Sequence, residues 1–300
     1  MAGNDFISNA VHRSGETAQD TQRLGEMVDA AGGGPAPSPS EAPSDASILN
    51  FALNLEYLEA EFYLRATGSA LPDELTTGTG TRGEVSGGKP VPFQNPVVRK
   101  FAQEIASDEK QHVTFLRGAL GSAAVSRPAI SLDQSFTAAA RAAGLIGEAD
   151  TFDPYENELN FLFAAYLFED VGVTAFKGAA PFIANKTYLD AAAGLLATEA
   201  YHAGIVRLSL YNQGVIDEAV FGAVQKISDV RNAVDHVGDD DQSIGDADTL
   251  NLIPTDGNGG AFGRTPQHIL NIVYLTPERA TQGGFYPAGL NGDLVESAGD

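Results

Sequence analysis

Two Glu-x-x-His pairs, each inside a helical stretch, constrain this chain more than any other feature of its sequence. The first pair is Glu109 with His112, and the second is Glu199 with His202. A separation of three residues places both side chains of a pair on one face of an α-helix, one turn apart. A single pair is more often a solvated helix surface than a metal site, so the residues around each pair decide its meaning.

Apolar residues share the helix face of each pair: Phe101, Ile105 and Leu116 lie beside Glu109, and Ala192, Leu195 and Val206 lie beside Glu199. Two further helical stretches each carry one glutamate on an apolar face, Glu56 and Glu169. Each of these is followed by an aromatic residue two turns later, Tyr63 or Phe176. The sequence therefore predicts four helices that each direct one glutamate toward a common core.

Four carboxylates that face one another inside an apolar core need compensating charge. An ionised carboxylate removed from water costs several kcal/mol even after relaxation, and like charges repel. Two divalent cations balance four carboxylates, and two neutral imidazoles complete the coordination. One Glu from each of two helices and Glu-x-x-His from each of two others form the ligand set of dinuclear sites in four-helix bundles. The predicted metal ligands and catalytic residues are Glu56, Glu109, His112, Glu169, Glu199 and His202.

The composition restricts the metal. The chain has no cysteine, which excludes disulfides, a thiolate nucleophile, iron–sulfur clusters and thiolate zinc sites. Carboxylate and imidazole ligands suit iron or manganese. The predicted cofactor is therefore a pair of divalent iron or manganese ions, with Glu109 and Glu169 as the expected bridging ligands.

The same helical geometry predicts where the residues next to the ligands lie. Glu59, one turn beyond Glu56, and Tyr63, two turns beyond it, are expected to surround the ligands without binding metal. Glu61 lies about 140° around the helix from Glu56 and is expected in solvent. The aspartates at 239–241 are also expected in a solvated loop.

The hydrophobic periodicity predicts an all-α fold. Helical spacing covers 47–67, 95–120, 155–177 and 184–212, which are expected to form the bundle, and a fifth helix is predicted at 217–234. A connection over 121–153, with a short helix near 134–143, is expected to cross the length of the bundle. A Gly-rich, largely irregular extension with one short helix at 267–274 follows. No segment shows the alternation of a strand.

These elements predict three parts of the chain. Residues 1–44 are interpreted as an arm that ends in a Gly/Pro/Ser linker. Residues 45–213 are expected to form the bundle. Residues 214–300 are expected to form the C-terminal helix and an extension packed on the bundle, because this segment contains residues such as Phe285 and Leu290 that are too apolar to remain in water.

The charge restricts the partners. Lys and Arg total 18 and Asp and Glu total 40, so the net charge is −22. This charge repels phosphate backbones and anionic lipid, and neither nucleic acid nor a membrane is an expected partner. The first 20 residues do not show an export signal, so a soluble protein, cytoplasmic by default, is expected.

Several segments resemble a known family. Residues 50–63, Asn-Phe-Ala-Leu-Asn-Leu-Glu-Tyr-Leu-Glu-Ala-Glu-Phe-Tyr, and the motif Asp108-Glu109-x-x-His112 resemble the ferritin-like domain of desiccation-related proteins from bacteria, fungi and plants. Residues 265–274 and 283–292 are similar to the C-terminal signature of that family. The resemblance covers about 45–295 and implies a ferritin-like four-helix bundle with a role in stress or desiccation tolerance. In the wider superfamily of ferritins, rubrerythrins and manganese catalases, the positions that match the six residues named above are metal ligands.

Two classes of function remain open at this level. The leading hypothesis is a redox enzyme that acts on a small oxidant, peroxide or oxygen, by catalase-like or ferroxidase-like chemistry. Catalase-type dismutation is slightly favoured because it needs no electron donor, and a chain without cysteine has no thiolate-bound iron to deliver electrons. The alternative is a non-enzymatic protective or interaction protein with a structural or empty metal site. Either class is compatible with a homodimer or a higher homo-oligomer.

Overall fold

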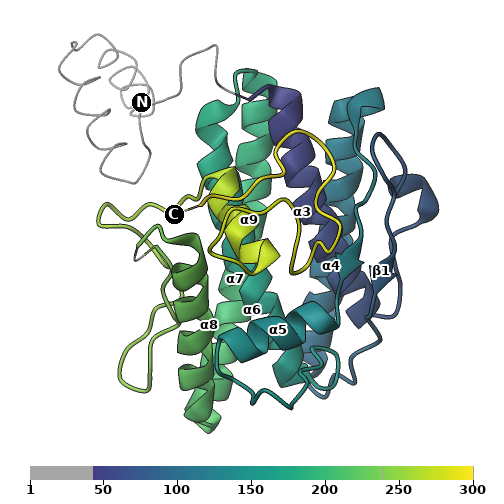
Figure 1. The fold of residues 1–300 in the computed structure, drawn as a ribbon. Helices are drawn as coiled ribbons and strands as arrows, with labels where there is room; N and C mark the ends of the chain where they lie inside the picture. Colours follow the sequence, from purple (N-terminus) through teal and green to yellow (C-terminus); the bar gives the residue numbers. More distant parts are fainter. Residues whose placement is uncertain (1–42, 239, 300) are drawn as a thin grey trace, which may run out of the picture.

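The computed structural model describes residues 43–238 and 240–299, and four long helices form its centre (Figure 1). The expected N-terminal arm therefore lies almost entirely outside the described residues. The four helices are α3 (Asp45–Ala66), α4 (Pro96–Leu120), α6 (Glu158–Ala179) and α7 (Lys186–Ile216). The prediction of an all-α, ferritin-like bundle is confirmed, and each predicted bundle helix differs from the observed one by at most four residues at either end.

Side-chain caps explain where the long helices begin. Ser44 accepts a hydrogen bond from the backbone of Ser47 at the start of α3, and Asn157 accepts one from Asn160 at the start of α6. Asn95 and Asn185 act in the same way before α4 and α7. Such caps satisfy backbone N–H groups that have no partner inside the helix.

The bundle consists of two antiparallel pairs, α3 with α4 and α6 with α7. The crossover leaves the end of α4 through the short helix η3 (Gly121–Ala123) and runs along the bundle to α5 (Gln134–Ala142) and the start of α6. On its way it contributes strand β2 (Ile130–Ser131), which pairs in parallel with β1 (Val85–Ser86) from the α3–α4 connection. The sequence did not predict this pair, because two residues are too few to show an alternating pattern.

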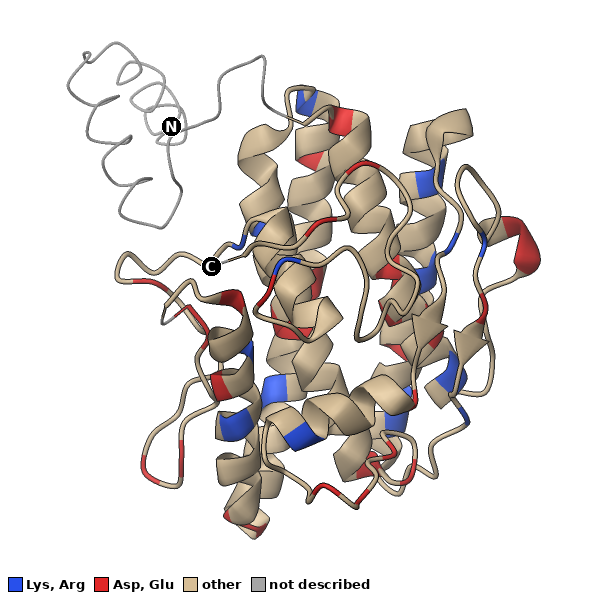
Figure 2. Ribbon diagram, viewed as in Figure 1, with Lys and Arg blue, Asp and Glu red and all other residues tan. Residues whose placement is uncertain are grey.

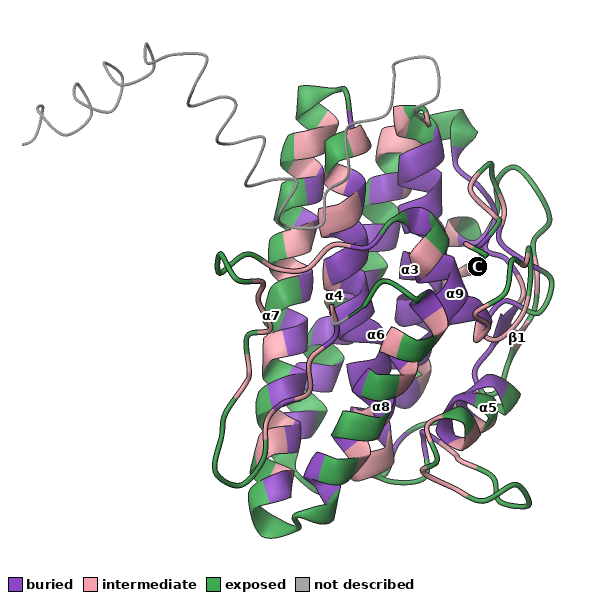
Figure 3. Cartoon of the chain, turned by 60° about the vertical axis from the view of Figure 1, so that its left-hand side comes forward, coloured by how far each residue is buried: buried purple, intermediate pink, exposed green. Residues whose placement is uncertain are grey.

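Helix α6 is the most apolar of the long helices. The segment Glu158–Phe182, which includes the short helix η4 (Ala180–Phe182), is long and apolar enough to cross a membrane, but 78% of its apolar 18-residue window is buried inside the molecule. Figure 3 shows α3 and α6 as largely buried helices, whereas α7 and α8 have exposed faces. A helix that is apolar on every side is expected at the centre of a bundle.

The C-terminal extension packs against the bundle helices. The extension contains helices α8 (Ala219–Asp235) and α9 (Pro266–Tyr274), and irregular chain joins them and follows α9. Outside the extension, the short helix η2 (Asp73–Leu75) lies in the α3–α4 connection. The ring of Phe285 lies 5.0 Å from that of Phe136 and 4.9 Å from that of Phe168, as measured between centroids. The extension therefore contributes side chains to the main hydrophobic core.

Two expectations about solvated acids are wrong. Glu61 is fully buried and forms ion pairs with Arg127 of the crossover and with Arg65. Asp241 is also buried, and it pairs with Arg231 at 2.6 Å and with Arg264 at 3.3 Å. The crossover covers Glu61, and Asp241 lies in a loop that packs against α8 through Arg231. Figure 2 shows acidic positions on the loops as well as on the helices.

Candidate metal centre

The six predicted ligands converge at the centre of the bundle. Glu56 lies on α3, Glu109 and His112 on α4, Glu169 on α6, and Glu199 and His202 on α7. None of these side chains is exposed: the relative accessibility of the four glutamates is at most 1%, and that of the two histidines is 5% and 3%. The pattern of one inward acid per helix thus places all six groups in one buried cluster.

The ligand atoms form two overlapping groups, within each of which all atoms lie within 4.8 Å of one another. The first group contains Glu56, Glu109, His112 and Glu199, and the second contains Glu109, Glu169, Glu199 and His202. Glu109 belongs to both groups, as a bridging ligand must. Glu199 also belongs to both groups, whereas Glu169 belongs to the second group alone.

Both histidines direct Nδ1 toward the carboxylates. Nδ1 of His112 lies 3.2 Å from Glu56 Oε2 and 3.3 Å from Glu199 Oε1. Nδ1 of His202 lies 3.0 Å from Glu109 Oε1. The two rings are 6.0 Å apart between centroids, with an angle of 28° between their planes. Each group of carboxylates therefore has one imidazole nitrogen.

Three neighbours support this arrangement. The hydroxyl of Tyr63 donates a hydrogen bond to Glu169 Oε1. Nε2 of His202 lies 3.3 Å from Oδ2 of Asp108. Gly172 allows the carboxylates to approach α6, because a Cβ atom at this position would lie 2.5 Å from Glu199 Oε2 and 3.2 Å from Glu59 Oε1.

Helical spacing alone assigned no role at the centre to Asp108 or Gly172. Asp108 directly precedes the ligand Glu109, and its side chain reaches α7 rather than the core of its own helix. Gly172 lies inside a helix, where glycine costs about 1 kcal/mol relative to alanine. An interior helical glycine is therefore a signal of close packing that the sequence offered.

Burial and mutual repulsion shift the titration of the cluster. Burial raises the pKa of Glu56, Glu169 and Glu199 above the ordinary glutamate value, and neighbouring carboxylates raise it further. Burial also raises the pKa of Glu59, together with the charge of Glu199. These shifts express the cost of several negative charges in one apolar space.

The pKa values of Glu109 and of the two histidines are shifted in the directions expected for ion pairs. Burial opposes the charged form of Glu109, but the adjacent imidazoles of His112 and His202 outweigh it and lower its pKa. Burial likewise opposes the charged form of His202, but the nearby negative charges of Glu169 and Glu109 raise its pKa to about 10. The pKa of His112 is raised for the same reasons. Without metal, the carboxylates thus hold protons on the imidazoles.

The donor atoms of the cluster fit a pair of hard or borderline cations. Both carboxylate oxygens of Glu109 and Glu199, one oxygen each of Glu56 and Glu169, and Nδ1 of His202 are buried and have no hydrogen-bond partner in the described part of the chain. Buried polar atoms without partners are costly and rare in native proteins. Carboxylate oxygens and imidazole nitrogens in this number suit iron or manganese.

Comparison with known proteins agrees with this geometry. The family model of the ferritin-like domain matches residues 44–212, which contain all four bundle helices apart from the last residues of α7. The chain belongs to the ferritin-like family. This ferritin-like protein is 30% identical to the desiccation-related protein PCC13-62 of Craterostigma plantagineum, over 83% of each chain. It is 28% identical to the ferritin-like catalase Nec2 of Nesocodon mauritianus, over 84% of this chain and 85% of the relative. No solved structure matches the ferritin-like chain.

Proposed function

We propose that this protein is a redox enzyme that consumes peroxide at a pair of iron or manganese ions. The observation that carries the proposal is the pair of overlapping ligand groups that share Glu109 and Glu199 inside the core. The name of the relative Nec2, a ferritin-like catalase, supports peroxide as the substrate. The residues that would hold the metals are Glu56, Glu109, His112, Glu169, Glu199 and His202.

When bound, the two metals would supply the oxidation states through which one peroxide is reduced to water and another is oxidised to oxygen. The residues of the chain orient the ligands and exclude bulk water. Tyr63 fixes one oxygen of Glu169 by its hydrogen bond, and Asp108 faces Nε2 of His202. Burial and the charge of Glu199 raise the pKa of Glu59, which favours its uncharged form beside the centre.

Dismutation is the peroxide reaction that this chain can perform without a partner. It consumes two peroxide molecules, one as the reductant and one as the oxidant, so that 2 H₂O₂ give 2 H₂O and O₂. A peroxidase would need electrons from a separate donor, and the absence of cysteine excludes a thiolate-bound iron within this chain.

Oxygen release from peroxide tests the proposal directly. The purified chain is loaded with manganese(II) or iron(II), its metal content is measured, and oxygen is followed with an electrode after addition of hydrogen peroxide without a donor. We expect one oxygen for every two peroxides consumed. Glu109→Gln should lower the rate by about 100-fold, whereas Glu104→Gln, an exposed glutamate on the same helix, should leave it unchanged.

Two outcomes would contradict the proposal and favour another role. A chain that contains two metals and releases no oxygen would support a structural metal site in a protective protein. Oxidation of iron(II) by oxygen without turnover of peroxide would support ferroxidase activity.

A further inference from the structure

The solvent side of α7 and the adjoining edge of α4 carry most of the exposed apolar side chains. Of the ten large apolar residues that are exposed in the described part of the chain, seven lie on these two helices. We call these seven the α4–α7 face: Val97 and Phe115 on α4, and Tyr201, Ile205, Leu208, Val215 and Ile216 on α7. Single exposed apolar residues are common on protein surfaces, but a gathering of them marks an interaction site.

The exposed residues of α7 follow the spacing of a helix–helix contact. Tyr201, Ile205, Leu208, Asn212 and Val215 are all exposed and are separated by four, three, four and three residues. This spacing keeps the side chains on one side of a helix, as in the seam along which two helices pack. A single asparagine among apolar residues fixes the register of such a seam. The solvent side of α7 therefore has the pattern of a helix that packs against a further helix.

The edge of α4 widens this row into a surface. Asp108 marks the side of α4 that adjoins α7, because its Oδ2 lies 3.3 Å from Nε2 of His202. Val97 precedes Asp108 by eleven residues and Phe115 follows it by seven, which corresponds to about three and two turns of helix. Both apolar side chains therefore share the side of α4 that adjoins α7.

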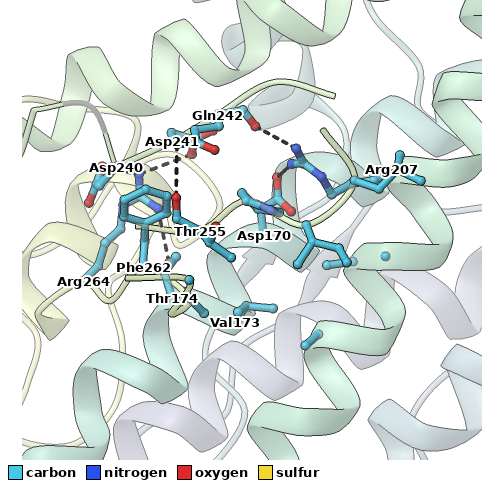
Figure 4. A pocket seen from close by; sticks show the side chains of 18 residues that line it. Asp170, Val173, Thr174, Arg207, Asp240, Asp241, Gln242, Thr255, Phe262 and Arg264 are labelled. Carbon is cyan, nitrogen blue, oxygen red and sulfur yellow. Dashed lines mark hydrogen bonds and ion pairs between the residues drawn. The ribbon is translucent and has the colours of Figure 1, made fainter. Parts of the chain in front are cut away.

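The opposite flank of α7 is covered by the chain that connects α8 with α9. Arg207 of α7 is buried and donates hydrogen bonds to Asp170 of α6 and to the carbonyl of Gln242 (Figure 4). The same connection encloses a cavity of about 200 Å³ with α6 and α7. The described part of the C-terminal extension therefore packs on one flank of α7 and leaves the residues of the α4–α7 face exposed.

The solvent side of α7 carries no charge along most of its length. Within residues 191–216 the ionisable groups are Glu199, His202 and Arg207, and all three are buried. The whole chain has a net charge of −22. Two copies therefore repel each other over most of their surface and can approach along α7 without bringing like charges together. A partner that is recognised by its charge finds no charged group on this side of α7.

The size of the α4–α7 face suits a dimer. The segment 191–216 is about 39 Å long, and two packed helices are roughly 20 Å wide, which gives an area of about 800 Å². A standard interface buries about 800 Å² on each partner. We propose that the α4–α7 face binds the same face of a second copy of this chain in a symmetric homodimer. Such a contact needs a surface that is complementary to itself, and an uncharged apolar surface meets this condition.

Sedimentation equilibrium of the full-length protein tests the proposal independently of metal and turnover. A chain of 31.4 kDa should sediment at twice this mass, with a dissociation constant of about 10 µM or lower both in chelator and with metal. The dimer should tighten from about 0.05 to 0.5 M salt, because salt screens the repulsion between two negatively charged chains. A monomer at about 100 µM, as expected if residues 1–42 or another protein covered the face, or a dimer that weakens with salt would overturn the proposal.

A matched pair of substitutions locates the contact. Leu208→Glu, at the middle of the α7 row, should weaken the dimer at least about 100-fold, because it brings negative charges of both copies into the contact. Val237→Glu is the control and should dimerise as the wild type does, because Val237 is exposed to a similar extent, 41% against 46%, but lies beyond α8. Val215→Glu, at a position that is 66% exposed and has little packing to lose, is a second test of the face. Melting curves verify that the variants fold, and a dimer that survives both Leu208→Glu and Val215→Glu would overturn the proposal.

Discussion

Nε2 of His202 on α7 lies 3.3 Å from Oδ2 of Asp108 on α4, so one contact joins the two helices that carry the Glu-x-x-His pairs. The same imidazole directs Nδ1 toward Glu109 at 3.0 Å. A carboxylate that accepts from one ring nitrogen fixes the orientation of the ring and leaves the other nitrogen free to bind a metal. Asp108 is therefore a positioning residue for the candidate centre.

Replacement of Asp108 should weaken metal binding although Asp108 is not itself a ligand. We expect Asp108→Ala to lower the affinity for manganese or iron by about 10–100-fold, because His202 loses the partner that orients it. Asp190→Ala, which removes an exposed aspartate from α7, is the control and should bind metal as the wild type does. Competition with a chelator measures both affinities, and equal values for the two variants would contradict this role.

Replacement of Glu109 separates metal binding from folding. Glu109→Gln removes one negative charge from a cluster of like charges and keeps the shape of the side chain. Metal bound per chain should fall below two, while the melting temperature of the metal-free protein should stay unchanged or rise. Elemental analysis and thermal melts with and without chelator measure the two effects. A variant that still binds two metals with wild-type affinity would exclude Glu109 as a ligand.

The metal-free protein should lose stability as the pH rises from 6 to 9. His202 has a pKa of about 10 in the folded protein because Glu169 and Glu109 outweigh the effect of burial. A group whose pKa is raised by folding contributes stability that is complete below its unfolded value, about 6.5 for histidine, and that is lost as the pH rises toward the folded value. The pKa values of Glu169 and Glu199 are also raised by folding, so these two carboxyls likewise contribute stability that is lost as the pH rises.

Bound metal should oppose the loss of stability with rising pH. Metal binding requires deprotonated ligands, so the increase in melting temperature on adding metal should grow from pH 6 to pH 9. The lowered pKa of Glu109 contributes an opposite slope only below about pH 4.5, outside this range. Melting curves of chelated and loaded samples across the range measure both trends. A chelated protein that is more stable at pH 9 than at pH 6 would show that the cluster does not titrate in this way.

A methyl group at position 172 should disturb the centre more than the helix. In Gly172→Ala the new Cβ would lie 2.5 Å from Glu199 Oε2, so the carboxylate must move and metal affinity should fall. Gly194→Ala is the control, because a Cβ at that position on α7 meets nothing within 4 Å. The control should gain up to about 1 kcal/mol of stability from helix propensity alone. Thermal melts and chelator competition distinguish these effects, and unchanged metal affinity in Gly172→Ala would contradict the prediction.

The buried ion pair between Glu61 and Arg127 should be costly to break from one side. Among the residues that the structure describes, Arg127→Leu leaves the fully buried carboxylate of Glu61 with the partly exposed Arg65 as its one charged partner. The loss of a partner from a buried pair typically destabilises a protein by about 3–5 kcal/mol. Denaturant unfolding measures this change. The double variant Glu61→Leu with Arg127→Leu should recover most of the loss, and a double variant less stable than Arg127→Leu would contradict the argument.

The sequence predicts the direction of a side chain around its own helix better than it predicts what covers that helix. The spacing of apolar residues located the bundle helices, and the inward direction of Glu56 and Glu169 followed from the same spacing. The spacing placed Glu61 in solvent because it cannot show that the crossover, with Arg127, packs on that side of α3. Asp108 was missed for a related reason, since its partner lies on a helix about 90 residues further along the chain.

The buried Asn54 connects α3 to the far end of the chain. Its Nδ2 donates to the carbonyl of Asn291, its Oδ1 accepts from the backbone of Asn291, and its own carbonyl accepts from the hydroxyl of Tyr286. These partners are separated from Asn54 by 232 to 237 residues. Contacts over such distances form late in folding because a long loop must close first. The helix that carries Glu56 is thus completed by residues more than 230 positions later in the sequence, and its core cannot be assembled before the ribosome has added Tyr286 and Asn291.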